Sequence, residues 1–190
     1  MLERLRERVR PLTSKAGRAL ARLTPDPDVY TYAGALTAWL VPLAAAVRPA
    51  LAPLLLIVSA LLDALDGAVA RAVGRSSRHG EFLDSFLDRL ADTAYYYSLL
   101  ILGVCAPAVL IAGMFSVIVS YARAKGELVG VKLRGVGLME RGDRVIVILV
   151  IMLVALAGYG REACALTWIL AVLVGATAAH RAARILGRLS

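Results

Sequence analysis

Long stretches without a charged residue alternate along this chain with short, mostly basic stretches. The uncharged stretches cover residues 29–47, 49–62, 93–122, 145–160 and 163–179. About 20 helical residues cross the hydrocarbon core of a bilayer, and a helix satisfies all of its backbone hydrogen bonds there. The apolar stretches lack the period-two alternation of strands in a membrane barrel. The pattern therefore predicts an all-α, polytopic membrane protein.

Glycine and proline residues divide the apolar stretches into separate helices. The stretch 93–122 is too long for one span and contains Gly103 and Pro107, which predicts two helices joined by a tight turn. Glycine and proline residues at similar boundaries elsewhere in the chain predict six transmembrane helices in total. They cover about 28–48, 51–73, 80–103, 107–125, 143–158 and 162–186, in one domain of residues 25–190.

Residues 1–24 form a separate amphipathic segment. Apolar residues recur there at steps of three or four, and cations occupy the other faces. The segment has no uninterrupted apolar core, so it does not resemble a cleavable signal peptide. It predicts a juxtamembrane helix that lies on an anionic membrane surface, with a loosely ordered basic tail as the alternative.

The charge balance adds an orientation to this topology. The chain carries 22 Lys and Arg against 14 Asp and Glu, a net charge of +8, while its mean hydropathy of +0.72 excludes an ordinary soluble domain. With six spans and a cytoplasmic N-terminus, Arg48 and Arg161 are the only basic residues in outer loops. We therefore expect a multi-pass protein of the cell membrane that contacts membrane lipids and has no nucleic-acid partner.

The two cysteines, Cys105 and Cys164, lack the spacing of metal ligands. Two buried, apolar thiols are the default interpretation. A disulfide is the alternative, because the topology places both residues toward the same membrane face.

Five aspartates lie in two otherwise apolar helices: Asp63, Asp66, Asp84, Asp88 and Asp92. A carboxylate at the centre of a bilayer costs about 2.5–3.5 kcal/mol on insertion scales, so the cluster needs a cationic partner. The first two aspartates share one helical face, as do the next two, and the helices are antiparallel neighbours. The four carboxylates predict a site for Mg²⁺, with Mn²⁺ as the alternative. A structural network with Arg71 and Arg89 is the other interpretation.

Residues beside these acids favour a phosphate ligand. Gly67 and Gly80 leave room for a ligand to approach the backbone, although close helix packing explains such glycines equally well. Arg71, one turn after Asp66, adds a guanidinium group suited to phosphate. Metals, glycines and an arginine together indicate a diphosphate site.

The segment from Asp63 to Asp88 resembles the signature of the CDP-alcohol phosphotransferase family. The signature is D-x2-D-G-x2-A-R-x8-G-x3-D-x3-D, and the segment matches it at every fixed position. The resemblance implies a membrane enzyme with six helices and an N-terminal interfacial helix, usually a homodimer. It also implies that Asp63, Asp66 and Asp84 hold two divalent metals on the diphosphate of a CDP-linked lipid. Asp88 would be a further metal ligand and the general base.

The same resemblance implies a set of residues that bind the CDP-linked lipid. Gly67, Arg71, Ser77 and Gly80 would line the cytidine and its phosphates. The segment 27–31 is similar to the family's Pro-(Asn/Asp)-x-x-Thr segment, which places Asp28 and Thr31 at the nucleotide.

Two later segments indicate which alcohol is the acceptor. Segments 120–127 and 137–144 resemble the Ser-Tyr-x-(Lys/Arg)-Ala-(Lys/Arg)-x-Glu and Glu-Arg-x-x-Arg segments of phosphatidylinositol phosphate and archaetidylinositol phosphate synthases, so the resemblance extends over about residues 26–181. Cations at the cytoplasmic ends of the last three spans suit a dianionic acceptor. The candidates for phosphate contact are Arg123, Lys125, Arg144 and Arg181. Anchoring to lipid head groups is the alternative for each one.

The sequence thus predicts a transferase of phospholipid biosynthesis. It would move a phosphatidyl or archaetidyl group from a CDP-linked lipid to myo-inositol 1-phosphate and release CMP. The nearest alternative is a phosphatidylglycerophosphate synthase, which uses glycerol 3-phosphate. A divalent-cation transporter is the alternative of a different class, but no acidic path continues toward the outer face.

Overall fold

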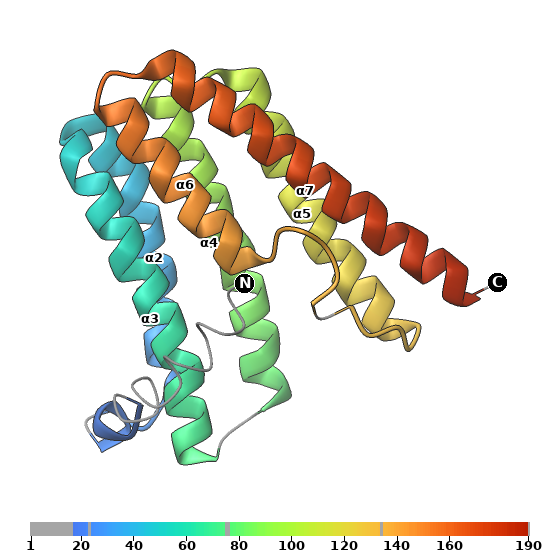
Figure 1. The fold of residues 1–190 in the computed structure, drawn as a ribbon. Coiled ribbons are helices and arrows are strands. Elements are labelled where there is room, and N and C mark those ends of the chain that lie inside the picture. Colours follow the sequence, from blue (N-terminus) through green and yellow to red (C-terminus); the bar gives the residue numbers. More distant parts are fainter. Residues whose placement is uncertain (1–16, 23, 75–76, 134, 190) are drawn as a thin grey trace. The chain divides into compact units, whose positions relative to one another are not determined.

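The computed structural model describes residues 17–22, 24–74, 77–133 and 135–189. Every regular element in this part of the chain is a helix (Figure 1). The elements are α2 (Pro27–Val47), η1 (Pro49–Leu51), α3 (Ala52–Val73), α4 (Arg78–Ile101), α5 (Ala106–Leu128), α6 (Arg141–Leu156) and α7 (Gly160–Leu189). Each of the six predicted spans corresponds to one of the long helices, and the observed boundaries differ from the predicted ones by a few residues.

Within the part of the chain that the structure describes, four segments are long and apolar enough to cross a membrane: α2, η1 with α3, α5 and α7. The protein is therefore a multi-pass, all-helical membrane protein. Helix α4 is less apolar because acidic and basic residues occupy its first half. Helix α6 has 16 residues and thus a length of about 24 Å. Crossing of the membrane by α4 and α6 stays a prediction.

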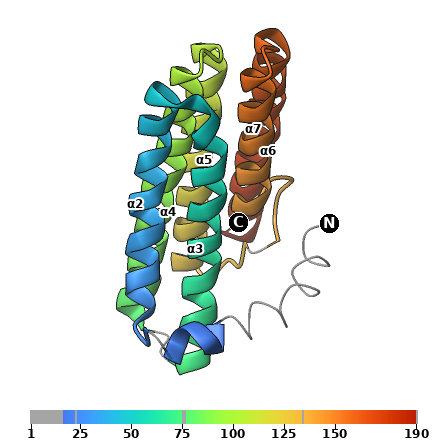
Figure 2. The same ribbon diagram turned by 90° about the vertical axis from the view of Figure 1, so that its left-hand side faces the viewer.

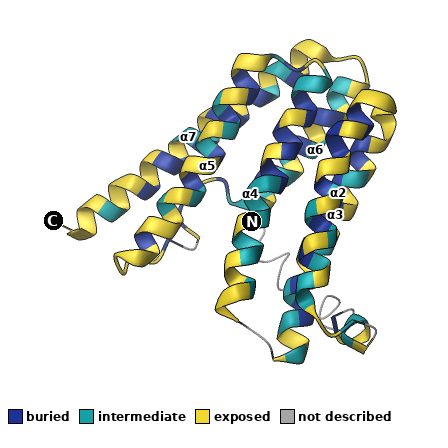
Figure 3. Ribbon diagram, turned by 180° about the vertical axis from the view of Figure 1, so that it is seen from behind, coloured by how far each residue is buried: buried dark blue, intermediate teal, exposed yellow. Residues whose placement is uncertain are grey.

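Many residues on the outer faces of the helices are large and apolar. Leu36 is 69% exposed, Val47 71% and Val172 67%, and exposed positions recur along the labelled helices in Figure 3. Large apolar side chains at this level of exposure are suited to contact with lipid.

Residues Met1–Tyr95 form one compact unit. Its helices α2 and α3 pack side by side (Figure 2). The Ser59 hydroxyl on α3 donates to the Gly34 carbonyl on α2 at 2.7 Å, and the Tyr95 hydroxyl on α4 donates to Ser59 Oγ at 2.8 Å. Tyr95 is fully buried and Ser59 is 2% exposed. This polar chain joins α2, α3 and α4 one turn from Asp63 along α3.

The turn between α3 and α4 is set by local signals. Gly74 ends α3 with a φ of +69°, in the left-handed region that glycine adopts at low cost. Ser77 precedes α4, and its hydroxyl oxygen accepts from the Gly80 amide at 2.9 Å. These two ends bring the acidic part of α4 back beside the acidic part of α3.

Part of the predicted N-terminal helix is described. Residues 17–22 are helical, and Gly17 packs so closely on α3 that an added Cβ would lie 2.6 Å from the Ala68 carbonyl oxygen. The Tyr30 hydroxyl donates to the Leu20 carbonyl at 3.3 Å. Residues 1–16 and 23 of the predicted segment 1–24 lie outside the described residues.

Residues Tyr96–Ser190 form the second compact unit, in which α7 packs on α5 and α6. Cys105, the residue directly before α5, and Cys164, near the start of α7, form a disulfide with a Cα–Cα distance of 5.4 Å. The default interpretation of two separate apolar thiols is therefore wrong. It failed because local spacing carries no information on which helix ends meet.

Candidate active site

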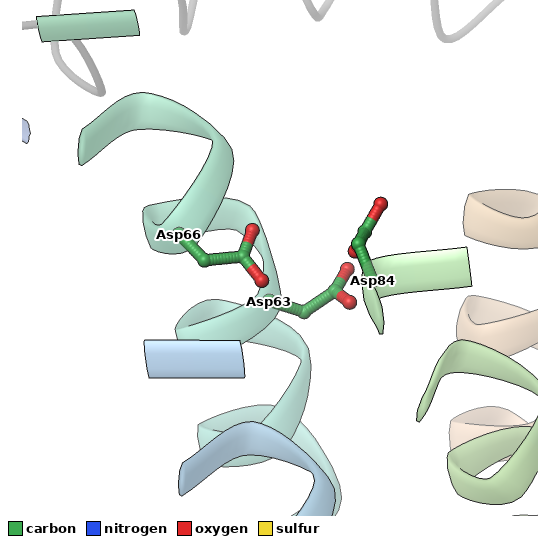
Figure 4. Close-up of side chains that lie close together, drawn as sticks. All are labelled: Asp63, Asp66 and Asp84. Atoms are coloured by element: carbon green, nitrogen blue, oxygen red, sulfur yellow. The ribbon is translucent and has the colours of Figure 1, made fainter. Parts of the chain in front are cut away.

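Three aspartates of the first unit converge on one point. Asp63 and Asp66 lie one turn apart on α3, and Asp84 lies on α4 (Figure 4). Each offers one carboxylate oxygen, and these oxygens all lie within 4.8 Å of one another. Asp66 is 6% exposed, whereas Asp63 and Asp84 are half-buried. We call these three residues the acidic cluster.

The acidic cluster fits a divalent metal ion. Asp66 Oδ1 accepts from the Gly67 amide, whereas Asp66 Oδ2 is buried and makes no hydrogen bond among the described residues. A buried carboxylate oxygen without a partner is costly. A cation held by the three carboxylates would satisfy it, and a set of oxygen donors suits hard cations such as Mg²⁺ or Mn²⁺.

Asp88, the fourth predicted ligand, lies one turn further along α4 and outside this cluster. Its Oδ2 is 3.6 Å from Arg89 Nη1, and Arg89 also donates to the Ser85 carbonyl. Arg71, in contrast, lies beside Gly67, where an added Cβ would be 3.2 Å from Arg71 Nη1. The glycine thus leaves room for the Arg71 guanidinium next to the acidic cluster.

The predicted nucleotide residues Asp28, Ser77 and Gly80 meet where α2 and α4 begin. An added Cβ at Gly80 would lie 3.3 Å from Ser77 Oγ and 3.6 Å from Asp28 Oδ1. Asp28 Oδ2 is also 3.7 Å from His79 Nε2, and the sequence did not predict this contact. The only feature of the sequence that indicates a role for His79 is its position directly before Gly80.

Thr31 links this nucleotide corner to the acidic cluster. It lies one turn into α2, where its hydroxyl donates to the Pro27 carbonyl at 3.3 Å and lies beside the Asp66 carboxylate. The signature residues and the segment 27–31 therefore occupy one continuous region of the first unit.

The predicted acceptor residues lie in the second unit. Arg144 on α6 is 2% exposed and Arg181 on α7 is 4% exposed. Arg123 and Arg144 each lie close enough to Arg181 to repel it electrostatically, with Glu127 and Glu140 nearby. Buried guanidinium groups of like charge are stable together when an anion lies between or beside them. This arrangement fits a phosphorylated ligand.

The individual contacts distinguish these cations. Arg181 donates through Nε to the Val136 carbonyl and through Nη1 to the Val119 carbonyl, each at 2.9 Å. Arg123 forms an ion pair with Glu127 at 2.9 Å. Lys125 is exposed, and its Nζ lies 5.9 Å from the centre of the Tyr121 ring. The sequence did not reveal that Arg181 also holds backbone carbonyls.

The helical fold and the acidic cluster define a membrane protein with a site for a divalent cation. Residues 27–179 match the CDP-alcohol phosphatidyltransferase family, and the chain belongs to this family. The enzymes of this family act on CDP-linked alcohols, in agreement with the resemblance carried by the segment from Asp63 to Asp88.

Several named relatives are similar over most of the chain. The archaetidylinositol phosphate synthase of Aeropyrum pernix is 46% identical over 177 residues, which cover 90% of this chain and 88% of the relative. That of Pyrococcus horikoshii is 36% identical over 152 residues, covering 79% and 81%.

Solved structures of the phosphatidylinositol phosphate synthase of Mycobacterium tuberculosis share the fold. The structure with CDP-DAG bound has a TM-score of 0.79 and 29% identity, and the match covers 92% of this chain and 94% of the other. The structure in complex with manganese and citrate has a TM-score of 0.78 and 29% identity, with coverages of 92% and 88%.

Proposed function

We propose that this enzyme transfers the phosphatidyl or archaetidyl group of a CDP-linked lipid to myo-inositol 1-phosphate and releases CMP. The observation that carries the choice of acceptor is the burial of Arg144 and Arg181 beside Arg123. A phosphate monoester supplies negative charge and hydrogen-bond acceptors to these guanidinium groups, whereas a neutral alcohol supplies no charge. The similarity to archaetidylinositol phosphate synthases supports the same acceptor.

In this proposal two Mg²⁺ ions bind at Asp63, Asp66, Asp84 and Asp88, with Mn²⁺ as the alternative. When bound, the metals neutralise the diphosphate and stabilise CMP as a leaving group. A manganese complex of a structural relative and the unpartnered Asp66 oxygen support a divalent metal at this site.

The residues of the chain have separate roles in this proposal. Asp88, besides binding a metal, accepts the proton of the attacking inositol hydroxyl. Arg71 binds a phosphate of the CDP-linked lipid beside Gly67. Asp28, Thr31, Ser77 and Gly80 bind the nucleotide where α2 and α4 begin. Arg123, Arg144 and Arg181 bind the acceptor phosphate, with Lys125 at its exposed edge.

We further propose that all six long helices of domain 25–190 span the cell membrane. Residues 1–24 form the interfacial helix, and the packing of Gly17 on Ala68 supports its attachment beside the acidic cluster. The N-terminus and active site then face the cytoplasm, as the distribution of Lys and Arg favours. The enzyme is a homodimer in this proposal, as the resemblance to the family implies.

Kinetics of an Arg144→Ala variant test the acceptor. Each charge-assisted bond to phosphate contributes about 1.5–3 kcal/mol, so the KM for inositol 1-phosphate should rise about tenfold to a hundredfold. The KM for the CDP-linked lipid should stay within about twofold of the wild type. Arg161→Ala removes an exposed arginine in the first turn of α7 and is the matched control, with unchanged constants. A wild-type KM for inositol 1-phosphate in Arg144→Ala would contradict the proposed acceptor site.

A further inference from the structure

Residues 136–139 belong to the connection between α5 and α6, and two of their side chains are buried, whereas Leu138 is exposed. Val136 is 7% exposed and Met139 is 6% exposed, although the loop has no regular secondary structure. The Val136 amide donates to the Leu133 carbonyl within the same connection at 3.1 Å. The buried Met139 amide also needs a hydrogen-bond partner.

Thr177 on α7 supplies this partner, and that of the Leu138 amide, from one side chain. Its Oγ1 accepts from the backbone amides of Leu138 and Met139, each at 3.1 Å, and donates to the Leu173 carbonyl at 2.8 Å. The hydroxyl is therefore fully engaged, and Thr177 has no exposed surface.

The methyl group of Thr177 holds the preceding loop residue. Gly137 has a φ of +115°, and a Cβ added there would overlap Thr177 Cγ2. Only glycine combines this backbone conformation with so close an approach. Thr177 thus contacts three consecutive residues of the loop.

Arg181 lies one turn after Thr177 on the same face of α7, and its Nε donates to the Val136 carbonyl. The two side chains together hold residues 136–139. Glu140 follows at once as the N-cap of α6 and forms a capping box with Asp143. Arg144 lies in the next turn of α6, so the position of the loop determines where this arginine lies.

We propose that Thr177 is a positioning residue for the phosphorylated acceptor: by fixing residues 136–139 on α7, it sets the placement of Arg144 beside Arg181. This inference rests on the proposed function. It predicts that the hydroxyl oxygen of Thr177 affects the binding of the acceptor phosphate and leaves the binding of the CDP-linked lipid unchanged.

Three substitutions separate this role from a general effect on folding. Thr177→Val keeps the shape and methyl group and removes the oxygen, whereas Thr177→Ser keeps the oxygen. Thr167→Val is the matched control, because Thr167 is equally buried on α7 and its hydroxyl donates to the Ala163 carbonyl of its own helix at 2.7 Å. CMP release by full-length enzyme in detergent gives kcat and KM for each substrate.

The expected result is selective. Thr177→Val should raise the KM for inositol 1-phosphate about tenfold, because the buried Met139 amide and the part-buried Leu138 amide lose their acceptor. Its KM for the CDP-linked lipid should stay within about twofold, and Thr177→Ser and Thr167→Val should resemble the wild type. A lower stability alone would reduce the active fraction, and hence kcat, for both substrates equally.

Gly137→Ala disrupts the same contact from the loop and serves if Thr177→Val does not fold. It should also raise the KM for inositol 1-phosphate selectively. Unchanged acceptor KM values in the folded variants, or an equal rise with Thr167→Val, would overturn the inference and leave the proposed function intact. If the wild type releases no CMP with inositol 1-phosphate, the proposed function and this inference are both overturned.

Discussion

Replacement of Asp66 with Asn removes one negative charge from the acidic cluster and preserves its shape. The asparagine oxygen can still accept the hydrogen bond from the Gly67 amide that Asp66 Oδ1 accepts. The substitution therefore removes only a charge. This removes the repulsion between Asp66 and both Asp63 and Asp84, whose oxygens lie within 4.8 Å of the Asp66 oxygen. We expect the substitution to raise the stability of the metal-free protein and to remove most of the stabilisation that a bound metal provides.

The distances give the magnitude. Two unit charges 4.8 Å apart repel by about 3.5 kcal/mol at an effective dielectric constant of about 20. Asp66 takes part in two such pairs, but Asp63 and Asp84 are half-buried, so solvent reduces the sum. The metal-free Asp66→Asn protein should be more stable than the wild type by about 1–3 kcal/mol. A metal at 100 times its Kd stabilises the wild type by about 2.7 kcal/mol, and the variant should lose most of that gain.

Thermal unfolding in detergent at pH 8 measures both effects, first in EDTA and then during titration with Mn²⁺. The wild-type Tm should rise with Mn²⁺, whereas the Asp66→Asn variant should start higher and stay nearly constant. Asp92→Asn is the control, because Asp92 is also buried on α4 but lies outside the cluster, and it should keep the metal-dependent rise. Two results would refute the reasoning. One is a Tm of Asp66→Asn that rises with Mn²⁺ as much as the wild-type Tm does, and the other is a Tm of Asp66→Asn in EDTA that is lower than the wild-type Tm.

Three further predictions concern single contacts. Arg181→Lys should raise the KM for inositol 1-phosphate as much as Arg181→Ala does. The reason is that one ammonium group cannot reach both the Val136 and Val119 carbonyls and also bind phosphate. A wild-type KM for inositol 1-phosphate in Arg181→Lys, measured by steady-state kinetics, would contradict this. Tyr95→Phe removes the hydroxyl that donates to Ser59 and should lower the free energy of unfolding by about 1–2 kcal/mol. An unchanged thermal unfolding curve would show that this hydrogen bond between α4 and α3 does not stabilise the protein. Cys164→Ala opens a disulfide with a sequence separation of 59 and should destabilise the protein by up to about 4 kcal/mol. Equal Tm values for Cys164→Ala and wild type under non-reducing conditions would contradict that expectation.

Local signals in the sequence predicted the helices well. Gly103 and Pro107 indicated a turn, and the structure ends α4 at Ile101 and begins α5 at Ala106. Spacing also predicted that Asp63, Asp66, Asp84 and Asp88 share one site, because each pair lies on one helical face and the two helices are antiparallel neighbours. The structure places the carboxylate oxygens of the first three together, while Asp88 lies outside this group and the role of each residue stays a prediction.

Contacts between distant segments could not be predicted in the same way. The disulfide between Cys105 and Cys164 depends on which helix ends meet, and periodicity does not encode this. Thr177 looked like any small residue in an apolar helix, because its role depends on a loop about 40 residues earlier in the chain. Arg181 was predicted as a ligand for phosphate, but its two bonds to backbone carbonyls depend on the local path of the chain.

The choice of acceptor is the central claim, and CMP release with a panel of alcohols tests it most directly. Purified wild-type enzyme with Mg²⁺ and one CDP-linked lipid would receive inositol 1-phosphate, glycerol 3-phosphate, free myo-inositol or serine, and mass spectrometry would identify the lipid product. The account predicts efficient CMP release with inositol 1-phosphate, formation of the inositol phosphate lipid, and poor turnover with free myo-inositol and serine. A higher kcat/KM for glycerol 3-phosphate, free inositol or serine would contradict it.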